Sequence, residues 1–337
     1  MILSAYDEFL LKTTDCIDWC DLNNKTIYIT GATGLIGSNL VQALLLCTDA
    51  HIVVQVRNEL KAKKMFGNNV EYIIGELQDK SDYSGDVDYV VHCANPTSSS
   101  FFVNNPVETI ETAVDGTNNI LEFAKNKRST VVFLSTMEVY GFPRKGHVVK
   151  ECEGGSFDSL VVRNCYPLSK QVCESLCAAY ASEYGVHTRV LRLTQTFGPG
   201  VSYNDGRVFA EFARCAIEKR NIILKTAGET ERSYLYTIDA VLAILTVLLK
   251  GADGEAYTAA NESTFCSILD MANLVADIGG VNVLIEKQDI SMMGYTGTLH
   301  MNLSTEKLKN LGWKAQVGLK EMYKSMIGNM INNLREV

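Results

Sequence analysis

The chain has 337 residues, of which 47% are hydrophobic and 21% charged, a composition typical of a globular protein with one or two domains. The net charge of -8 and the isoelectric point near 5.3 argue against a basic surface for nucleic acid or an anionic membrane. The longest apolar stretch, Ala240 to Leu249, has about half the length of a membrane span. We therefore expect neither a nucleic-acid partner nor membrane association.

Short apolar runs alternate with helical segments over the first part of the sequence. Residues 1–24 predict an amphipathic helical lead-in. The expected strands are Thr26–Thr30, His51–Val56, Val70–Ile74, Val87–Val91, Thr130–Leu134 and Thr188–Leu193. The expected helices are Leu35–Leu46, Pro106–Lys125 and Tyr166–Tyr184. Apolar strands that alternate with helices predict an α/β fold, a doubly wound parallel sheet of the Rossmann type with at least six strands.

The pattern changes after Leu193. Helical stretches at Asp205–Lys219 and Thr237–Leu249 alternate with short extended pieces, and Leu319–Asn332 predicts a closing helix. We expect a smaller C-terminal substrate domain. The predicted Rossmann domain takes residues 1–194 plus about 233–262, and the smaller domain takes about 195–232 plus 263–337.

The ten cysteines make up about 3% of the chain, far below the density of small secreted proteins built on disulfides. The sequence contains no CxxC pair and no histidine-rich cluster, so we expect reduced thiols and no metal site. Its first residues lack the basic start and the small-residue cleavage site of a signal peptide. These features predict a cytoplasmic protein.

A glycine-rich turn follows the first expected strand directly and opens the first expected helix. In such a turn the first glycine permits a tight bend and the second lets backbone N–H groups approach a pyrophosphate. The third allows close packing of helix on strand. The turn predicts a dinucleotide site at Gly31, Thr33, Gly34, Leu35, Ile36 and Gly37.

The end of the second strand usually carries an acidic residue that holds the adenosine ribose of the dinucleotide. This sequence has Val56-Arg57-Asn58 there, and Glu59 is the nearby carboxylate. Arg57 could stack on adenine, meet a 2′-phosphate or begin a loop as a solvated side chain. This position therefore leaves NAD and NADP open.

Tyr166 and Lys170 lie four residues apart, so both occupy one face of the expected helix. A free phenol has a pKa of about 10, and a nearby ammonium together with a cationic nicotinamide would favour the phenolate. Tyr166 would then be a base that removes a hydroxyl proton while hydride leaves to the cofactor. The alternative is an ordinary pair on a helix surface.

Polar residues follow the expected strand Thr130–Leu134, at Ser135, Thr136 and Glu138. Ligands of parallel sheets bind at the carboxyl ends of the strands. Thr136 could hydrogen-bond a substrate hydroxyl, and Glu138 could supply a carboxylate at a neighbouring carbon. Serine and threonine are also common turn formers, which is the alternative for this segment.

The glycine turn, the polar strand end and the tyrosine–lysine pair, in this order, resemble the extended short-chain dehydrogenase/reductase superfamily. Further matches point to its nucleotide-sugar epimerase, dehydratase and decarboxylase branch. They are Val90–Pro96, Asn105–Asn118, Phe197–Gly200 and Arg232–Asp239. Within the branch, Asn204–Val208 and Arg163–Tyr166 look most like the UDP-glucuronate decarboxylases, also called UDP-xylose synthases.

The resemblance implies a role for each matched position. Glu76 and Leu77 would flank the adenine, and Ala94, Pro96 and Ser135 would contact the cofactor. Tyr166 and Lys170 would be the hydride-transfer pair, which also contacts the cofactor, with Thr136 assisting and Glu138 acting at the sugar ring. The substrate diphosphate or carboxylate would meet Gln195, Arg207 and Arg232.

Three positions depart from the pattern of the branch. The 4,6-dehydratases carry an aspartic acid where this chain has Met137, and a thioether cannot donate the proton that the leaving hydroxyl needs. The decarboxylases usually carry serine there, so Met137 departs from them as well. Ala113 and Gln195 each replace an asparagine.

The resemblance implies an enzyme that passes through a transient 4-keto sugar, and we expect a nucleotide-hexuronate decarboxylase that acts on UDP-glucuronate. A 4-epimerase is the alternative, a 4,6-dehydratase is disfavoured by Met137, and a non-catalytic NAD(P)-sensing regulator is the reading outside this class. We expect NAD as cofactor, because a cycle without net redox change favours a retained NAD. The helices Pro106–Lys125 and Tyr166–Tyr184 resemble those that form a dimer interface, so a homodimer is expected.

Overall fold

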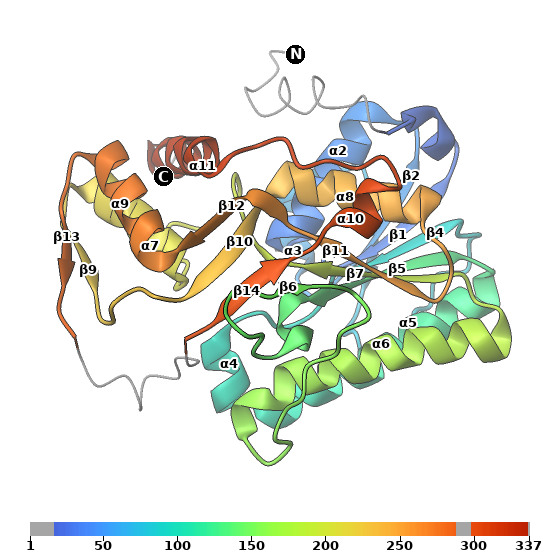
Figure 1. Cartoon of the computed structure of the whole chain (residues 1–337). Helices are drawn as coiled ribbons and strands as arrows, with labels where there is room; N and C mark the ends of the chain where they lie inside the picture. The colour runs from blue at the N-terminus through green and yellow to red at the C-terminus, as the bar shows by residue number, and fades with distance from the viewer. Residues whose placement is uncertain (1–16, 288–297, 336–337) are drawn as a thin grey trace.

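A seven-stranded parallel sheet forms the centre of the structure, with its strands in the order β11-β7-β5-β4-β1-β2-β3 (Figure 1). The computed structural model describes residues 17–287 and 298–335. The strands are β1 (Thr26–Thr30), β2 (His51–Val56), β3 (Glu71–Ile74), β4 (Tyr89–His92), β5 (Thr130–Thr136), β7 (Thr188–Leu193) and β11 (Glu255–Ala259). The order winds outward from β1 in both directions, which confirms the predicted doubly wound sheet. The sequence pattern had not identified β11, which pairs with β7 as an edge strand.

Alternating side chains of the central strands face opposite layers of helices, which is why these strands are largely apolar. Tyr28 belongs to the buried cluster on one face of the sheet, whereas Ile27 and Ile29 belong to the cluster on the other. The same alternation continues on β5, where Phe133 and Leu134 face opposite sides. The sheet is therefore covered on both faces.

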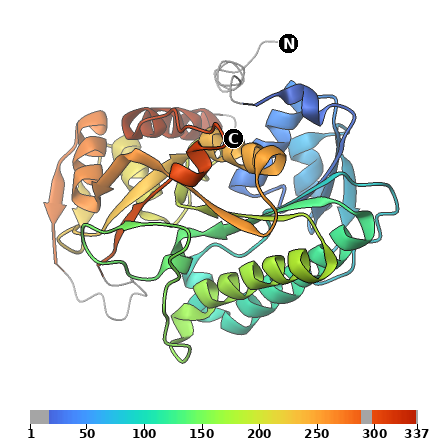
Figure 2. The same cartoon turned by 45° about the vertical axis from the view of Figure 1, so that its right-hand side comes forward.

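The helices α5 (Pro106–Lys127) and α6 (Cys165–Tyr184) lie side by side on one face, and α2 (Leu35–Cys47) and α8 (Thr237–Lys250) cover the other (Figures 1 and 2). These helices begin and end close to the predicted positions. Two short helices, α3 (Glu59–Phe66) and α4 (Ser99–Asn104), were not predicted. The predicted lead-in, residues 1–24, lies mostly outside the described residues. Its described last part contains a short 3-10 helix, η2 (Trp19–Leu22).

A second, mixed sheet with strand order β12-β10-β14-β6 lies beside the carboxyl ends of the main sheet (Figure 1). Its strands are β6 (Val148–Val149), β8 (Gln195–Phe197), β10 (Glu231–Tyr236), β12 (Asn261–Ser267) and β14 (His300–Leu303), with β8 paired to β10. A two-stranded sheet, β9 (Ile222–Leu224) and β13 (Val283–Ile285), lies at the far edge. The remaining helices are α7 (Val208–Glu218), α9 (Ile268–Gly279), α10 (Glu306–Lys309) and α11 (Leu319–Arg335). The domain boundaries given above stay a prediction.

The buried carboxylate of Asp239 fastens the segment before α11 to the start of α8. It accepts hydrogen bonds from the backbone N–H groups of Gln316 and Val317, at 3.0 and 3.2 Å. The indole N–H of Trp313 donates to the backbone oxygen of Asp239 at 3.0 Å.

None of the helices within residues 17–287 and 298–335 combines the length and the apolar character that crossing a bilayer demands.

His92, at the end of β4, links three elements below the glycine turn. Its ring nitrogens lie 2.7 Å from Thr30 Oγ1 on β1 and 3.2 Å from Thr117 Oγ1 on α5. The Thr30 hydroxyl also accepts the backbone N–H of Ala94 at 3.2 Å. Burial, with a smaller contribution from the charge of Lys170, lowers the pKa of His92 to about 3.

The buried neutral ring of His92 should make the fold sensitive to acid. The unfolded chain takes up a proton at an ordinary histidine pKa near 6.5, whereas the folded chain does not, so stability falls as the pH drops below 6.5. From pH 6.5 to 5 this should cost about 2 kcal/mol of unfolding free energy, and His92→Gln should remove that loss. Urea unfolding across this range measures it, with the exposed His51→Gln as control. An unchanged pH slope in His92→Gln would contradict the assignment.

Candidate active site

The glycine turn between β1 and α2 leaves no room for side chains. Gly31 has a φ of +68°, and a Cβ there would lie 2.7 Å from the backbone nitrogen of Ala94. A Cβ on Gly37 would lie 2.3 Å from the backbone oxygen of Gly31, so only glycine permits this approach of helix to strand. Helix α2 starts after Gly34 without a side-chain cap, so its first N–H groups can bind an anion. Thr33, Leu35 and Ile36 lie partly buried around this start.

The loop after β4 contributes an unsatisfied amide beside the same turn. Both the side-chain nitrogen and the side-chain oxygen of Asn95 are buried without a hydrogen-bond partner. Buried polar atoms without partners are rare, so a donor and an acceptor at this position fit a polar ligand. Together with the glycine cradle, Asn95 makes the site fit a dinucleotide. Ala94 and Pro96, which flank Asn95 and are partly buried, were predicted from the sequence, whereas Asn95 itself was not.

The residues predicted to lie near the adenine differ in exposure. Arg57 and Glu76 come together at its surface, with Arg57 Nη1 3.7 Å from Glu76 Oε2. Leu77 instead is buried against α5, since a Cβ on Gly116 would lie 2.4 Å from Leu77 Cδ2. Leu77 therefore packs against α5 and does not expose its side chain where the adenine was predicted to lie.

Tyr166 is 7% exposed and lies in the first turn of α6. Its ring stacks on Phe102 of α4, with centroids 4.1 Å apart and planes within 7°. Burial raises the pKa of Tyr166 well above its ordinary value and the Glu138 carboxylate raises it further, while a hydrogen bond with Thr136 and the charge of Arg163 lower it. The side chains alone therefore keep Tyr166 a phenol at neutral pH, and a cationic ring beside it would favour the phenolate.

Lys170 lies one helical turn after Tyr166 and is 3% exposed. Its ammonium donates to the backbone oxygen of Leu134 at 2.7 Å and lies 4.4 Å from the centre of the Phe133 ring. Burial lowers the pKa of Lys170 to about 8. The lysine is thus anchored to the end of β5, one helical turn from the predicted base.

Glu138 forms an ion pair with Arg163 at the mouth of the site. Arg163 Nη2 lies 3.0 Å from Glu138 Oε2 and 3.3 Å from Oε1, and the two side chains are 17% and 30% exposed, respectively. The guanidinium also lies over the Phe102 ring, 5.1 Å from its centre. Its Nε is buried without a partner. Arg163 was noted in the sequence only as part of a resemblance, because a charge beside Tyr166 gives no signal of its own.

Met137, between Thr136 and Glu138, is buried in a small apolar cluster with residues of β6 and β14. Its sulfur accepts a hydrogen bond from Thr194 Oγ1 at 3.2 Å. Met137 therefore serves the packing of this region, and its thioether has no proton to donate.

A buried ion pair holds the end of β5 to α6 and β7. Glu174 Oε2 accepts from Arg192 Nη2 at 2.7 Å, and both side chains are 12% exposed. Glu174 Oε1 accepts from Ser135 Oγ at 2.5 Å, so the hydroxyl predicted to contact the cofactor serves this network here. Arg192 Nη1 also donates to the backbone oxygen of Glu151 at 2.9 Å. The carboxylate of Glu174 was missed, because nothing in the sequence marks the partner of a buried arginine.

Of the three residues predicted to bind the substrate, Gln195 and Arg232 are hydrogen-bonded to each other, whereas Arg207 pairs with Asp205. Arg232 Nη1 donates to Gln195 Oε1 at 3.1 Å between the neighbouring strands β10 and β8, and Arg232 Nε is buried without a partner. Arg207 precedes α7 and is held by Asp205, with Nε 2.9 Å from Oδ1, over the ring of Phe209. Arg232 thus keeps a free donor, whereas Arg207 is neutralised by its neighbour.

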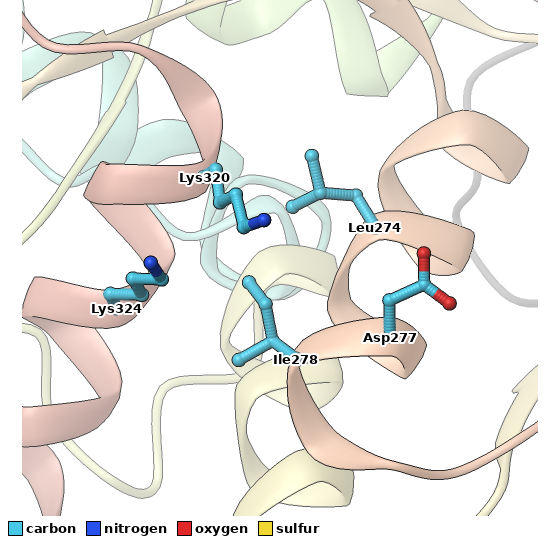
Figure 3. A pocket seen from close by; sticks show the side chains of 5 residues that line it. All are labelled: Leu274, Asp277, Ile278, Lys320 and Lys324. Atoms are coloured by element: carbon cyan, nitrogen blue, oxygen red, sulfur yellow. The ribbon is translucent and has the colours of Figure 1, made fainter.

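A hollow of about 500 Å³ lies elsewhere, between α9 and α11, and is lined by Leu274, Asp277, Ile278, Lys320 and Lys324 (Figure 3). It contains none of the residues predicted from the sequence. In the described part of the chain, no three His, Cys, Asp or Glu side chains are grouped so as to hold a metal ion. The candidate active site is therefore the edge where β1, β4 and β5 end.

Residues 27–261 match the model of the NAD dependent epimerase/dehydratase family, which is more than half of the chain. The chain belongs to this family. UDP-glucuronic acid decarboxylase 1 of Xenopus tropicalis is 32% identical over 278 residues, 79% of this chain and 64% of that protein, so the match spans less than two thirds of that relative's length. UDP-glucuronic acid decarboxylase 5 of Arabidopsis thaliana is 30% identical over 89% of this chain and 87% of its own.

Solved structures of the same fold agree with this membership. The UDP-glucose 4-epimerase of Thermotoga maritima, solved with UDP-glucose, aligns with a TM-score of 0.80 over 92% of this chain and 99% of its own, at 23% identity. The UDP-glucose 4-epimerase of Thermus thermophilus, solved with NAD, aligns with a TM-score of 0.76 over 91% of this chain and 99% of its own, at 21% identity. The family is described as NAD dependent and the Thermus thermophilus neighbour was solved with NAD, and at this identity the two neighbours establish the fold of this chain.

Removal of the Glu174 carboxylate should destabilise this family member strongly. Glu174→Ala leaves Arg192 buried and unpaired, which should cost about 3 to 5 kcal/mol of unfolding free energy. The matched control is Glu255→Ala, which breaks the more exposed pair with Lys307 and should cost less than about 1 kcal/mol. Urea unfolding of both variants at neutral pH measures the difference. Equal losses of unfolding free energy in the two variants would contradict this prediction.

Proposed function

We propose that this chain is a nucleotide-hexuronate decarboxylase that acts on UDP-glucuronate through a transient 4-keto sugar, with a nicotinamide dinucleotide held in the glycine cradle. The observation that carries the proposal is the Arg163–Glu138 ion pair beside Tyr166. The similarity to UDP-glucuronic acid decarboxylases supports the same substrate class.

The ion pair suits a substrate that carries a carboxylate. Glu138 alone would repel a second negative charge brought close to Tyr166. Arg163 offsets that repulsion, and its buried Nε has no partner within the described residues and can donate to a carboxylate oxygen. A neutral hexose has no group that needs a buried cation there. A hexuronate does.

The first proposed step is oxidation at C4 of the sugar. Tyr166 as phenolate takes the proton of the 4-hydroxyl, and Thr136, hydrogen-bonded to the phenol, helps to hold that oxygen. A dinucleotide bound in the glycine cradle would supply the hydride acceptor for this oxidation and the hydride for the later reduction. Lys170, on α6 and bonded to the backbone oxygen of Leu134, would add positive charge that favours the phenolate.

The second proposed step breaks the bond between C5 and C6. The carboxylate leaves as carbon dioxide, and its electron pair moves to C5 and spreads onto the new C4 carbonyl as an enolate. A proton then adds to C5, the hydride returns to C4, and Tyr166 returns the proton to the C4 oxygen. One proton is consumed and one carbon dioxide released, with no net oxidation.

A 4-epimerase would share the first step only, and the fold of the solved epimerases is the same. The buried thioether of Met137 offers no acid for dehydration, so it disfavours a 4,6-dehydratase and does not separate the other two reactions. The charged pair next to Tyr166 favours decarboxylation.

Mass spectrometry of UDP-glucuronate incubated with the protein tests the proposal, and we expect loss of carbon dioxide. Arg163→Met should weaken binding of UDP-glucuronate about tenfold or more, because a charged hydrogen bond to the carboxylate is lost. Its binding of UDP-glucose should change little. Calorimetry with the two sugar nucleotides measures this split.

Arg144→Met, which removes an exposed arginine from the loop after Glu138, is the matched control and should leave both affinities unchanged. Conversion of UDP-glucose to an isomer of equal mass, with no loss of carbon dioxide from UDP-glucuronate, would replace the proposal by the epimerase. Equal weakening of both sugar nucleotides by Arg163→Met would remove the carboxylate role of Arg163.

We also propose a homodimer formed through α5 and α6, which lie together along one face of the protein (Figure 2). Apolar side chains are exposed on these helices, with Val107 65%, Ile110 44% and Val172 47% exposed. Such exposed apolar side chains on adjacent helices are typical of an interaction surface.

Light scattering at micromolar concentration should report twice the chain mass. The double variant Val107→Lys, Ile110→Lys should be monomeric, because two charges would have to be buried in the interface. Leu60→Lys, which changes an exposed apolar side chain on α3, should stay dimeric. A monomeric unmodified chain would remove the proposal.

A further inference from the structure

A chain of buried hydrogen bonds runs beneath the candidate active site, from the loop after β4 to helix α6. At its first end the backbone N–H of Ala94 donates to Thr30 Oγ1 at 3.2 Å, and this hydroxyl lies 2.7 Å from His92 Nδ1. On the other side of the ring, His92 Nε2 lies 3.2 Å from Thr117 Oγ1. The three side chains are at most 2% exposed, so each depends on the protein for its partners.

The chain continues onto α6 through a cysteine thiol. Thr117 Oγ1 donates to Cys173 Sγ at 3.3 Å, and this thiol donates to the backbone oxygen of Ala113 at 3.2 Å. Cys173 is fully buried and lies three residues after Lys170 on the same helix. Residues three apart are neighbours on a helix surface, so the chain ends beside the lysine of the proposed hydride-transfer pair.

The two ends of the chain determine the direction of every bond in it. A carbonyl oxygen can only accept, so the thiol proton points to Ala113 and the proton of the Thr117 hydroxyl points to the sulfur. The Thr117 oxygen then accepts from Nε2 of His92. At the other end the Thr30 oxygen accepts the N–H of Ala94, so its own proton goes to Nδ1 of the ring. His92 is thereby assigned as the neutral tautomer with its proton on Nε2.

We propose that His92 is a positioning residue for hydride transfer, because this one-way chain through its ring sets the helix of Tyr166 and Lys170 against the glycine cradle. Thr30 directly precedes the glycine turn, and Cys173 belongs to α6, so the chain joins both sides of the site. A misplacement of about 1 Å between reacting groups can lower a rate about a hundredfold. The inference rests on the proposed function only for the reaction in which its effect is measured.

The direction of the chain can be tested without a substrate. Long-range proton–nitrogen NMR spectra of protein labelled with nitrogen-15 in its histidines distinguish the two neutral tautomers from each other and from the charged ring. His92→Gln identifies the signals of His92 by their loss. We expect the proton on Nε2 at neutral pH. A proton on Nδ1, or a charged ring, would overturn the inference.

The positioning role is tested by breaking the chain at two adjacent points, with His92→Leu and Thr117→Val. In the folded variants, kcat for UDP-glucuronate should fall about tenfold to a hundredfold with little change in KM, because the helix with Tyr166 is no longer held in register. Thr117→Ser keeps the hydroxyl and should retain most of the rate. A role in stability alone would lower the free energy of unfolding and leave kcat of the folded protein unchanged.

Ser129→Ala is the matched control, because Ser129 Oγ is also buried and donates to the backbone oxygen of Val87 at 2.7 Å, at the opposite edge of the sheet. It should cost a free energy of unfolding similar to that of Thr117→Val and leave kcat unchanged. An unchanged kcat in Thr117→Val, or an equal loss of kcat in Thr117→Ser or Ser129→Ala, would overturn the inference. A protein that releases no carbon dioxide but converts UDP-glucose would overturn the proposed function alone, and the same variants would then be compared on UDP-glucose, whose oxidation at C4 needs the same positioning.

Discussion

The parallel pairing of β4 between β1 and β5 is the constraint on which the candidate site depends. Thr30, His92 and Phe133 lie in one row across these strands. Because the strands run the same way, the residues just beyond this row emerge at one edge of the sheet. These residues belong to the glycine turn, the Asn95 loop and the polar segment that contains Glu138. The hydrogen bonds of His92 to β1 and α5 fix the row from within.

Burial shifts the pKa of both groups of the proposed hydride-transfer pair toward the neutral form. It raises the pKa of the Tyr166 phenol and lowers that of the Lys170 ammonium. The charged pair of the site is Arg163–Glu138, whose two members act on the phenol with opposite sign. In the protein alone Tyr166 therefore stays a phenol at neutral pH.

The parts of the site that follow from local sequence were predictable, and those that need two distant segments were not. The glycine turn and the Tyr166–Lys170 spacing are fixed by the geometry of one strand–turn–helix unit and one helix face. The doubly wound parallel sheet followed from apolar runs that alternate with helices, whereas its strand order came from the structure. Edge strand β11 was missed because its residues Glu255–Ala259 are mixed in polarity, as only part of an edge strand is covered. The Asn95 amide and the Arg163 and Glu174 partners depend on contacts between segments that sequence spacing does not encode.

Met137 shows how one substitution joins the chemistry of the site to the packing of the second sheet. Its thioether is buried in a cluster with Met301 and Leu303 of β14, so the side chain that follows Thr136 supports the second sheet instead of facing a leaving group. An aspartic acid placed there would have to bury a carboxyl group among apolar side chains, at a cost of several kcal/mol unless it found a partner. The packing around Met137 therefore couples this position to the second sheet. An acid at position 137 would require the cluster with β6 and β14 to change as well.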